Sequence, residues 1–182
     1  MPAATLERKF TYEDYAALTD DKRYELIGGE LIMTPAPMTR HQMISGEVDF
    51  AVRSFVKQRK SGRVFSAPTD VVLSNYVVVQ PDILFVSNER AAIITEANIQ
   101  GAPDLVVEIV SDSSAHIDFG RKKMLYDRYG VAEYWIVIPD AEAVEVFSRT
   151  EKGLVLNRRY EKWETLESGL LAGFGMELAG IF

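Results

Sequence analysis

Three charged residues lie in segments of the sequence that are otherwise mostly apolar. Asp82 lies in VVVQPDILFV, Glu108 in PDLVVEIVS and Lys122 in DFGRKKMLYDRYGV. Aspartate, glutamate and lysine are seldom buried unless they pair with an opposite charge or bind a metal ion. Two carboxylates on adjacent strands would also repel each other unless a cation or a shared proton neutralised them. We therefore expect Asp82 and Glu108 to bind one divalent cation, which would be Mg²⁺ or Mn²⁺ because its ligands are oxygens alone.

Lys122 is expected to reach the same site from a helix. At about 100° per residue, Lys122 lies between Tyr126 and Tyr129 on the helical wheel, at the centre of the face that would pack on the sheet. The neighbouring basic residues, Arg121 and Lys123, lie on its two flanks. A lysine that reaches two carboxylates and a metal ion can orient a water molecule and stabilise the charge that develops on a phosphate.

Each of these residues also has a purely structural interpretation. Asp82 could be a turn residue at the end of a strand, and Glu108 could be a buried ion-pair partner. His41 lies on the inward face of its predicted helix, where it is either a hydrogen-bonded core histidine or a catalytic or ligating one. Asp70 stays open, because a shift of one residue in the turn after its strand would direct its side chain toward Asp82 or away from it.

Two further Pro-Asp dipeptides are weaker candidates than the one that contains Asp82. Asp104 is four residues from Glu108 on the same predicted strand. At ~3.3 Å per residue the two lie about 13 Å apart, so they cannot share one ion. Asp140 follows the strand EYWIVIP, where a turn aspartate is expected. Asp82 alone of the three is flanked by strand on both sides.

The surrounding sequence predicts the elements that position these residues. Thr11 and Asp14 form a capping-box pattern that opens a short helix, and Gly28-Gly29 is a favoured turn between two short strands. An apolar stripe predicts a helix from Thr39 to about Gln58. A second helix is predicted over residues 117–129, and strands in VFSAPTDVVL, YVVVQPDILFV, PDLVVEIVS, EYWIVIP, AVEVFSR and LVLNRRY.

The order of these elements predicts the fold class. The first two of the listed strands would form a hairpin across Ser74-Asn75, and PDLVVEIVS would connect to EYWIVIP through the helix as a βαβ crossover. We expect an α/β sandwich in one domain over residues 1–182: a mixed central β-sheet flanked by helices, with an added N-terminal hairpin.

The composition narrows the class of protein. The absence of cysteine excludes disulfides, thiolate zinc sites and a cysteine nucleophile. No apolar stretch approaches the ~20 residues of a membrane span, and the N-terminus lacks the apolar core of a signal peptide, so we expect a soluble cytoplasmic protein. The net charge of −7 argues mildly against nucleic acid as a partner, although clusters of basic residues could form a local phosphate-binding groove.

Together these segments resemble the PD-(D/E)xK nuclease superfamily, and more closely its Uma-two family of putative restriction endonucleases. The resemblance runs from RYELIGGEL through APTDVVL, VVVQPDILFV, GAPDLVVEIVS and DFGRKKMLYDRYGVAEYWIVIPD to LAGFGMELAGIF. It implies a restriction-endonuclease-like fold, with Asp82 as the motif aspartate and Glu108 as the metal-binding glutamate. The lysine expected two residues after the glutamate is Val110 here, and the resemblance assigns its role to Lys122. It also strengthens the case for His41.

The sequence therefore predicts a Mg²⁺- or Mn²⁺-dependent endonuclease that hydrolyses DNA phosphodiester bonds, with Asp82, Glu108, Lys122 and His41 as its catalytic residues. A homodimer would suit this activity, because a duplex has two strands to cut. Two alternatives stay open. The protein could be a catalytically silent module that binds nucleic acid or protein on a nuclease fold, which its acidity favours, or a metal-dependent hydrolase of a smaller phosphoester.

Overall fold

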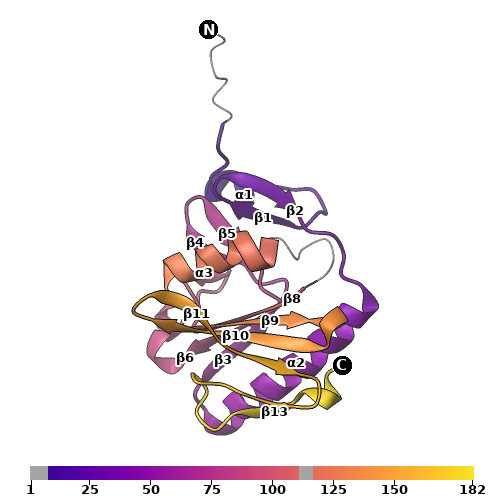
Figure 1. The fold of residues 1–182 in the computed structure, drawn as a ribbon. Coiled ribbons are helices and arrows are strands. Elements are labelled where there is room, and N and C mark those ends of the chain that lie inside the picture. Colours follow the sequence, from indigo (N-terminus) through magenta and orange to yellow (C-terminus); the bar gives the residue numbers. More distant parts are fainter. Residues whose placement is uncertain (1–7, 111–116) are drawn as a thin grey trace.

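A mixed six-stranded sheet runs through the centre of the molecule (Figure 1). The structure is a computed structural model that describes residues 8–110 and 117–182, and for residues 117–119 it describes the backbone alone. β8 and β9 are parallel, and every other neighbouring pair in this sheet is antiparallel, which confirms the predicted mixed sheet. In the order β11-β10-β9-β8-β6-β3, the strands are Gly153–Glu161, Ala143–Thr150, Glu133–Ile138, Leu105–Ile109, Ile83–Ser87 and Gly62–Ser66.

A second sheet of five strands contains the predicted N-terminal hairpin at its edge (Figure 1). The turn of this hairpin is formed by Gly28 and Gly29 at φ of 66° and 88°, a backbone region that residues with a Cβ rarely adopt. The hairpin is therefore confirmed, but it forms the edge of this second sheet and is not attached to the central one. In the order β2-β1-β5-β4-β7, the strands are Glu30–Met33, Tyr24–Ile27, Val77–Val79, Val71–Ser74 and Ile99–Gln100.

Two segments that the sequence predicts as single strands are each divided between the two sheets. VFSAPTDVVL contains β3 and β4, and YVVVQPDILFV contains β5 and β6. β4 pairs with β5 in the five-stranded sheet, whereas β3 pairs with β6 in the six-stranded sheet. The predicted hairpin is confirmed, because both halves pair antiparallel, and its turn lies at Asn75-Tyr76, one residue later than expected. The division of each segment between two sheets was not predicted, because an apolar pattern is the same whether a strand continues or passes to another sheet. Asp82 lies directly before β6, where the chain makes this passage.

The predicted long helix is confirmed as α2, Thr39–Arg59. Met38, at the N-cap position, makes no side-chain hydrogen bond to the first turn. The helix is therefore stabilised by packing and not by an N-terminal cap. The buried residues recur every four positions and form one stripe against the six-stranded sheet. They are Ile44, Val48, Val52 and Val56.

The other helices are short. α1, Tyr12–Ala16, begins at the predicted capping box of Thr11 and Asp14. The helix predicted over residues 117–129 has two parts, a π-helical turn at Ile117–Lys122 and then α3 at Lys123–Tyr129. Single π-helical turns are uncommon and often occur at functional sites. The remaining elements are the 3₁₀ turns Asn88–Ile93, Pro139–Ala141 and Leu178–Gly180 and the strands β12, Thr165–Glu167, and β13, Gly175–Glu177.

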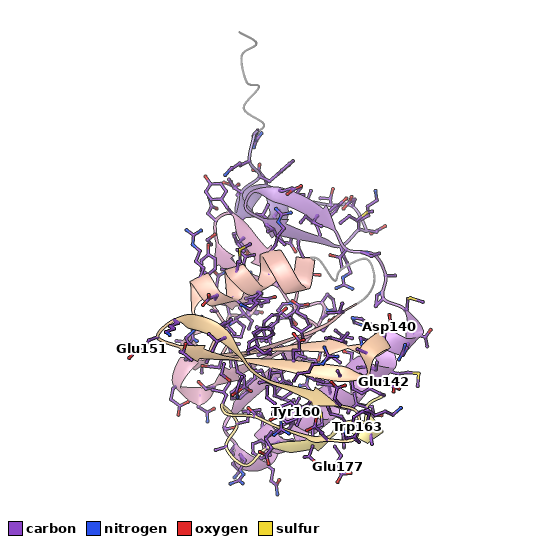
Figure 2. The ribbon with its side chains drawn as sticks, in the orientation of Figure 1. Asp140, Glu142, Glu151, Tyr160, Trp163 and Glu177 are labelled. Carbon is purple, nitrogen blue, oxygen red and sulfur yellow. The ribbon has the colours of Figure 1, made fainter. Side chains whose placement is uncertain are left out.

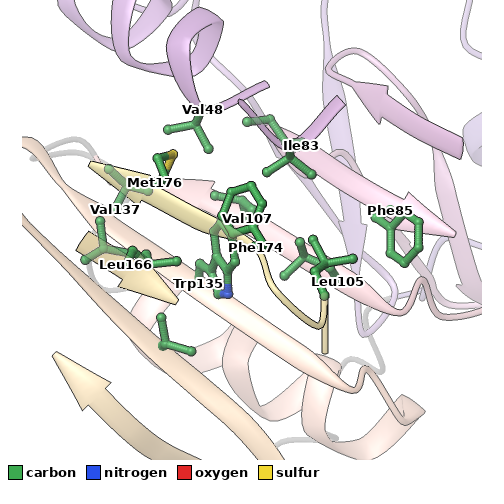
Figure 3. Close-up of a cluster of buried hydrophobic side chains, with 14 of the residues drawn as sticks. Val48, Ile83, Phe85, Leu105, Val107, Trp135, Val137, Leu166, Phe174 and Met176 are labelled. Atoms are coloured by element: carbon green, nitrogen blue, oxygen red, sulfur yellow. The ribbon is translucent and has the colours of Figure 1, made fainter. Parts of the chain in front are cut away.

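Apolar clusters fill both faces of the six-stranded sheet. On one face, Trp135 and Val107 of the sheet pack against α2 and against the C-terminal segment, residues 162–182, which contributes Phe174 (Figure 3). The opposite face packs against α3 and the five-stranded sheet. Because side chains alternate along a strand, Val106 lies in this second cluster, and Glu108 points to the same side. In the described part of the chain, no helix is both long and apolar enough to span a bilayer.

Candidate active site

Lys122 is buried between two glutamates that come from different sheets. Its Nζ atom lies 3.1 Å from Oε1 of Glu108 on β8 and 3.0 Å from Oε1 of Glu25 on β1. The side chains of Lys122, Glu108 and Glu25 are only 8%, 4% and 6% exposed. The prediction that Lys122 faces the sheet is confirmed, since both Lys122 and Tyr126, one turn later, are buried. The charges that meet Lys122 are therefore shielded from solvent.

Tyr126 adds a second donor to Glu108. Its hydroxyl donates a hydrogen bond of 2.6 Å to Oε1 of Glu108, the oxygen that also contacts Lys122. Burial of the ring and the charge of Glu108 raise the pKa of the Tyr126 hydroxyl well above its ordinary value. The hydroxyl therefore keeps its proton and remains a donor at any ordinary pH.

Asp82 and His41 form a second pair of predicted site residues. Oδ2 of Asp82 lies 3.2 Å from Nε2 of His41, which belongs to the first turn of α2. The same oxygen accepts the backbone N–H of Ile109 over 2.7 Å. With 18% and 15% of their side chains exposed, Asp82 and His41 are less buried than the lysine cluster. His41 is thus beside a site carboxylate and not solely in contact with core residues.

The hydrogen bond from Ile109 places Asp82 beside β8. Ile83 pairs with Val107 in the antiparallel ladder between β6 and β8. The ladder ends at this pair, and Asp82, the residue before it, accepts the N–H of Ile109 with its side chain, so Asp82 lies beside the part of β8 that carries Glu108. The structure thus brings together Lys122 with Glu108 and His41 with Asp82, and the bond to Ile109 connects the two pairs.

Asp70, whose direction the sequence left open, lies in a neighbouring polar cluster. Its Oδ1 atom accepts hydrogen bonds of 2.8 Å from the Tyr15 hydroxyl and from the side-chain amide of Gln80. The backbone N–H of Gln80 in turn donates to Oε1 of Glu25 over 2.7 Å. Asp70 is therefore connected to Lys122 through Gln80 and Glu25.

The other two Pro-Asp aspartates make the contacts of structural residues. Asp104 lies just before β8, where it accepts the backbone N–H of Ser87 over 2.7 Å and lies 3.5 Å from Arg90. Asp140 follows β9 at the surface (Figure 2) and pairs with Arg40 at 3.0 Å. Their positions agree with the interpretation that only Asp82 belongs to the site.

The donor set at this site suits a hard divalent cation. Two buried carboxylates, Glu25 and Glu108, face the single ammonium of Lys122, and Asp82 adds another carboxylate at the edge. Within the described residues, no three His, Cys, Asp or Glu side chains converge closely enough to enclose a metal ion. Mg²⁺ needs no such enclosure, because it commonly binds one or two carboxylates and completes its shell with water and substrate phosphate. Asp82 and Glu108 fit this mode of binding.

Sequence patterns did not identify Glu25 or Tyr126 as part of the site. Glu25 alternates with apolar residues in a strand of only four residues, a pattern that is usual for a solvated or ion-paired side chain. The side chain does form an ion pair, with Lys122, but it is buried. A carboxylate in an apolar run was the signal that identified Glu108, and the run around Glu25 is too short to carry it. Tyr126 was assigned to the correct helix face, but its hydrogen bond depends on a strand elsewhere in the fold.

Comparisons with known proteins identify relatives of this chain. A family model described as Uma2, putative restriction endonuclease, matches residues 11–179. The fold is similar to the crystal structure of a putative nuclease belonging to DUF820 from Anabaena variabilis ATCC 29413. The TM-score is 0.79 and the sequence identity 19%, over 95% of this chain and 97% of that chain, a likeness that shows the fold alone. No curated protein matches the sequence.

Proposed function

The chain belongs to the Uma2 family of putative restriction endonucleases, and from this premise we propose that it is a Mg²⁺- or Mn²⁺-dependent endonuclease that hydrolyses DNA phosphodiester bonds. The observation that carries the proposal is the buried ammonium of Lys122 against Glu108, next to the Asp82–His41 pair. These groups combine the negative charge that attracts a divalent cation with the positive charge that stabilises a phosphate in its transition state.

Asp82 and Glu108 are the residues that would hold the cation. When bound, such an ion supplies Lewis acidity and lowers the pKa of a coordinated water. The protein orients both carboxylates in advance, Asp82 through the N–H of Ile109 and Glu108 through the hydroxyl of Tyr126. Ligands that are already oriented need little rearrangement when the substrate arrives.

Lys122 and His41 would act on the substrate itself. The ammonium of Lys122 would stabilise the negative charge that develops on the scissile phosphate, and its two carboxylate contacts hold it in place. His41 contacts Asp82 through Nε2, which orients its ring for proton transfer at the same end of the sheet.

A catalytically silent module that binds nucleic acid or protein is the second candidate, and two observations favour it. The net charge is −7, and the arginines Arg40 and Arg121 are each paired with an acidic residue, Asp140 at 3.0 Å and Glu30 at 2.8 Å. Phosphate backbones are usually bound by clustered basic side chains. A protein of this kind would bind its partner without cutting it.

A cleavage assay separates these functions. Purified protein is incubated with supercoiled plasmid, single-stranded DNA, RNA and a small phosphodiester, in Mg²⁺, in Mn²⁺ or in EDTA. We expect the plasmid to be cut in either metal and not in EDTA, and a homodimer would give linear product with little nicked intermediate. Binding of plasmid without cleavage would support the silent module. Cleavage of the small phosphodiester alone would support a metal-dependent hydrolase of a smaller phosphoester.

The variant Asp82→Asn tests the site directly. It keeps the shape and one hydrogen-bond acceptor but removes the charge that would hold the cation, so we expect the rate to fall by about 100-fold or more. Asp140→Asn is the matched control, because Asp140 also follows a proline but is exposed and lies outside the site. This variant should keep full activity. Cleavage that survives Asp82→Asn would contradict the proposed site.

A further inference from the structure

We infer that Glu25 is a positioning residue of the active site, which holds the ammonium of Lys122 where it can reach the scissile phosphate. The inference rests on the proposed function and extends it to the N-terminal hairpin, β1 and β2, which no motif in the sequence assigned to catalysis. The five-stranded sheet would then contribute a residue to the site, in addition to packing against the central sheet.

The ammonium of Lys122 is held by two glutamates rather than one. Nζ lies 3.0 Å from Oε1 of Glu25 and 3.1 Å from Oε1 of Glu108, so the two carboxylates hold it from two directions. Each glutamate belongs to a different sheet, and the lysine belongs to the π-helical turn between them. The lysine side chain is long and flexible, so a second partner at its end narrows the range of positions of the ammonium.

Glu25 is itself held by the segment that carries Asp82. The backbone N–H of Gln80 donates to Oε1 of Glu25 over 2.7 Å, and Gln80 precedes Asp82 by two residues. The side chain of Gln80 is held in turn by Arg23, 3.2 Å from its Oε1 atom. The contact of Glu25 therefore links the position of the lysine to that of the aspartate.

Removal of the charge on Glu25 should pull Lys122 toward Glu108 alone. The ammonium and Glu108 would then neutralise each other, which would weaken both the hold of Glu108 on a cation and the field of the lysine at the phosphate. Because this field matters most in the transition state, kcat should fall while KM stays nearly constant.

The hairpin offers a matched control in Glu30. Like Glu25, it pairs with a basic residue of the π-helical turn, since its Oε2 atom lies 2.8 Å from Arg121. Its side chain is 65% exposed, however, and the pair lies at the surface. Glu30→Gln therefore removes the same charge from the same hairpin without touching Lys122.

The experiment measures kcat and KM for plasmid cleavage by Glu25→Gln, Glu25→Asp and Glu30→Gln, each in the wild-type and in the Lys122→Met background. We expect Glu25→Gln to lower kcat by about 10- to 100-fold, the usual effect of removing a group that orients a catalytic residue. Glu25→Asp, which keeps the charge on a shorter side chain, should recover part of the rate. In the Lys122→Met background Glu25→Gln should cost nothing further, because both changes remove one interaction.

If the wild type is active, any of four results would overturn the inference. Glu25→Gln could cleave as fast as Glu30→Gln, or could change KM alone, or could lose as much activity with Met at position 122 as with lysine. If Glu25→Gln does not fold, as its melting curve would show, Glu25→Asp decides, and full activity of that variant counts against the inference. An inactive wild type would instead refute the proposed function, and the inference with it.

Discussion

At the scale of single residues, burial separates two adjacent lysines. Lys122 is the only buried lysine in the part of the chain that the structure describes, and two glutamates replace the water it has lost. Nζ of Lys123 donates to the carbonyl of Leu154 over 3.1 Å and lies 5.1 Å from the centre of the Phe147 ring. One residue along a helix turns the side chain by about 100°, which is enough to direct the two lysines to different surroundings.

These surroundings predict different costs for the two lysines. Lys122→Met keeps most of the volume and the apolar stem but removes the charge, so we expect the rate of plasmid cleavage to fall by about 10²–10³-fold. Lys123→Met should leave the rate nearly unchanged and affect only the packing against β10 and β11. Initial rates at saturating Mg²⁺ measure the difference. Equal losses, or a larger loss in Lys123→Met, would show that the lysine was wrongly assigned and would direct attention to His41.

At the scale of elements, one buried carboxylate fastens the C-terminal segment to the central sheet. Glu133 at the start of β9 is 1% exposed, and its two oxygens accept four hydrogen bonds. The donors are Nε1 of Trp135 at 2.8 Å, Oγ of Ser168 at 2.6 Å and the backbone N–H groups of Gly169 at 3.0 Å and Leu170 at 3.1 Å. This segment covers the cluster of Figure 3, so the anchor supports the face of the sheet opposite Glu108.

The anchor predicts a large loss of stability in Glu133→Ala. Four donors would lose their acceptor, two of them on the buried side chains of Trp135 and Ser168, and we expect the free energy of unfolding to fall by about 3 kcal/mol. Urea denaturation followed by tryptophan fluorescence measures this change. Glu167→Ala, an exposed glutamate on β12 nearby, is the control and should stay within about 0.5 kcal/mol of wild type. A loss below that range in Glu133→Ala would mean that the segment is held by its apolar contacts alone.

Asp49 joins α2 to β3 and makes this junction sensitive to acid. Burial tends to raise the pKa of Asp49, but hydrogen bonds from Arg53 and Ser66 outweigh it, so the pKa is lower than the ordinary value. A carboxyl group with a lowered pKa stabilises the fold above its unfolded pKa of about 3.9, and this contribution is lost as the pH falls through the folded pKa.

We therefore expect the difference in unfolding free energy between wild type and Asp49→Asn to depend on pH. The difference should be constant from about pH 7 to about pH 5 and should shrink below about pH 4, where wild type also loses the charge. Urea titrations of both proteins across this range measure it. A difference that stays constant down to pH 3 would show that the carboxylate charge contributes nothing to the junction.

At the scale of the whole molecule, the site lies where two sheets meet. The chain passes from β5 to β6 at Asp82, while Glu25 belongs to one sheet and Glu108 to the other. Acidic groups from both sheets therefore converge on one lysine in a protein of net charge −7. Such a concentration of negative charge opposes the close approach of the sheets unless cations balance it.

This arrangement predicts that Mg²⁺ stabilises the protein against heat. A ligand that binds only the folded state adds about 2.7 kcal/mol at a concentration 100 times its Kd, which raises the melting temperature. Asp82→Asn should melt at or above the wild-type temperature without metal, since one repelling charge is gone, and should respond little to Mg²⁺. Differential scanning fluorimetry at constant ionic strength measures both effects, with Asp140→Asn as control. An equal response in wild type and Asp82→Asn would place the binding of Mg²⁺ elsewhere.

The sequence by itself determined the features that depend on a few neighbouring residues. The turn at Gly28-Gly29 follows from residue type, because glycine readily adopts positive φ. The stripe of α2 and the burial of Lys122 follow from the helical period, and the order of strand, helix and strand indicated the βαβ crossover. The same local signals identified Asp82 and Glu108 as charged residues in apolar surroundings. The resemblance to one family added the role expected of each.

Only the tertiary structure decided which charges meet. The apolar pattern of YVVVQPDILFV does not reveal that β5 and β6 belong to different sheets, because side-chain alternation is the same in either case. The pairing of Glu25 with Lys122, the hydrogen bond from Tyr126 to Glu108 and the contact of His41 with Asp82 depend on that passage between sheets. A period records which side of an element is buried, but the partner across the core is set by the path of the whole chain.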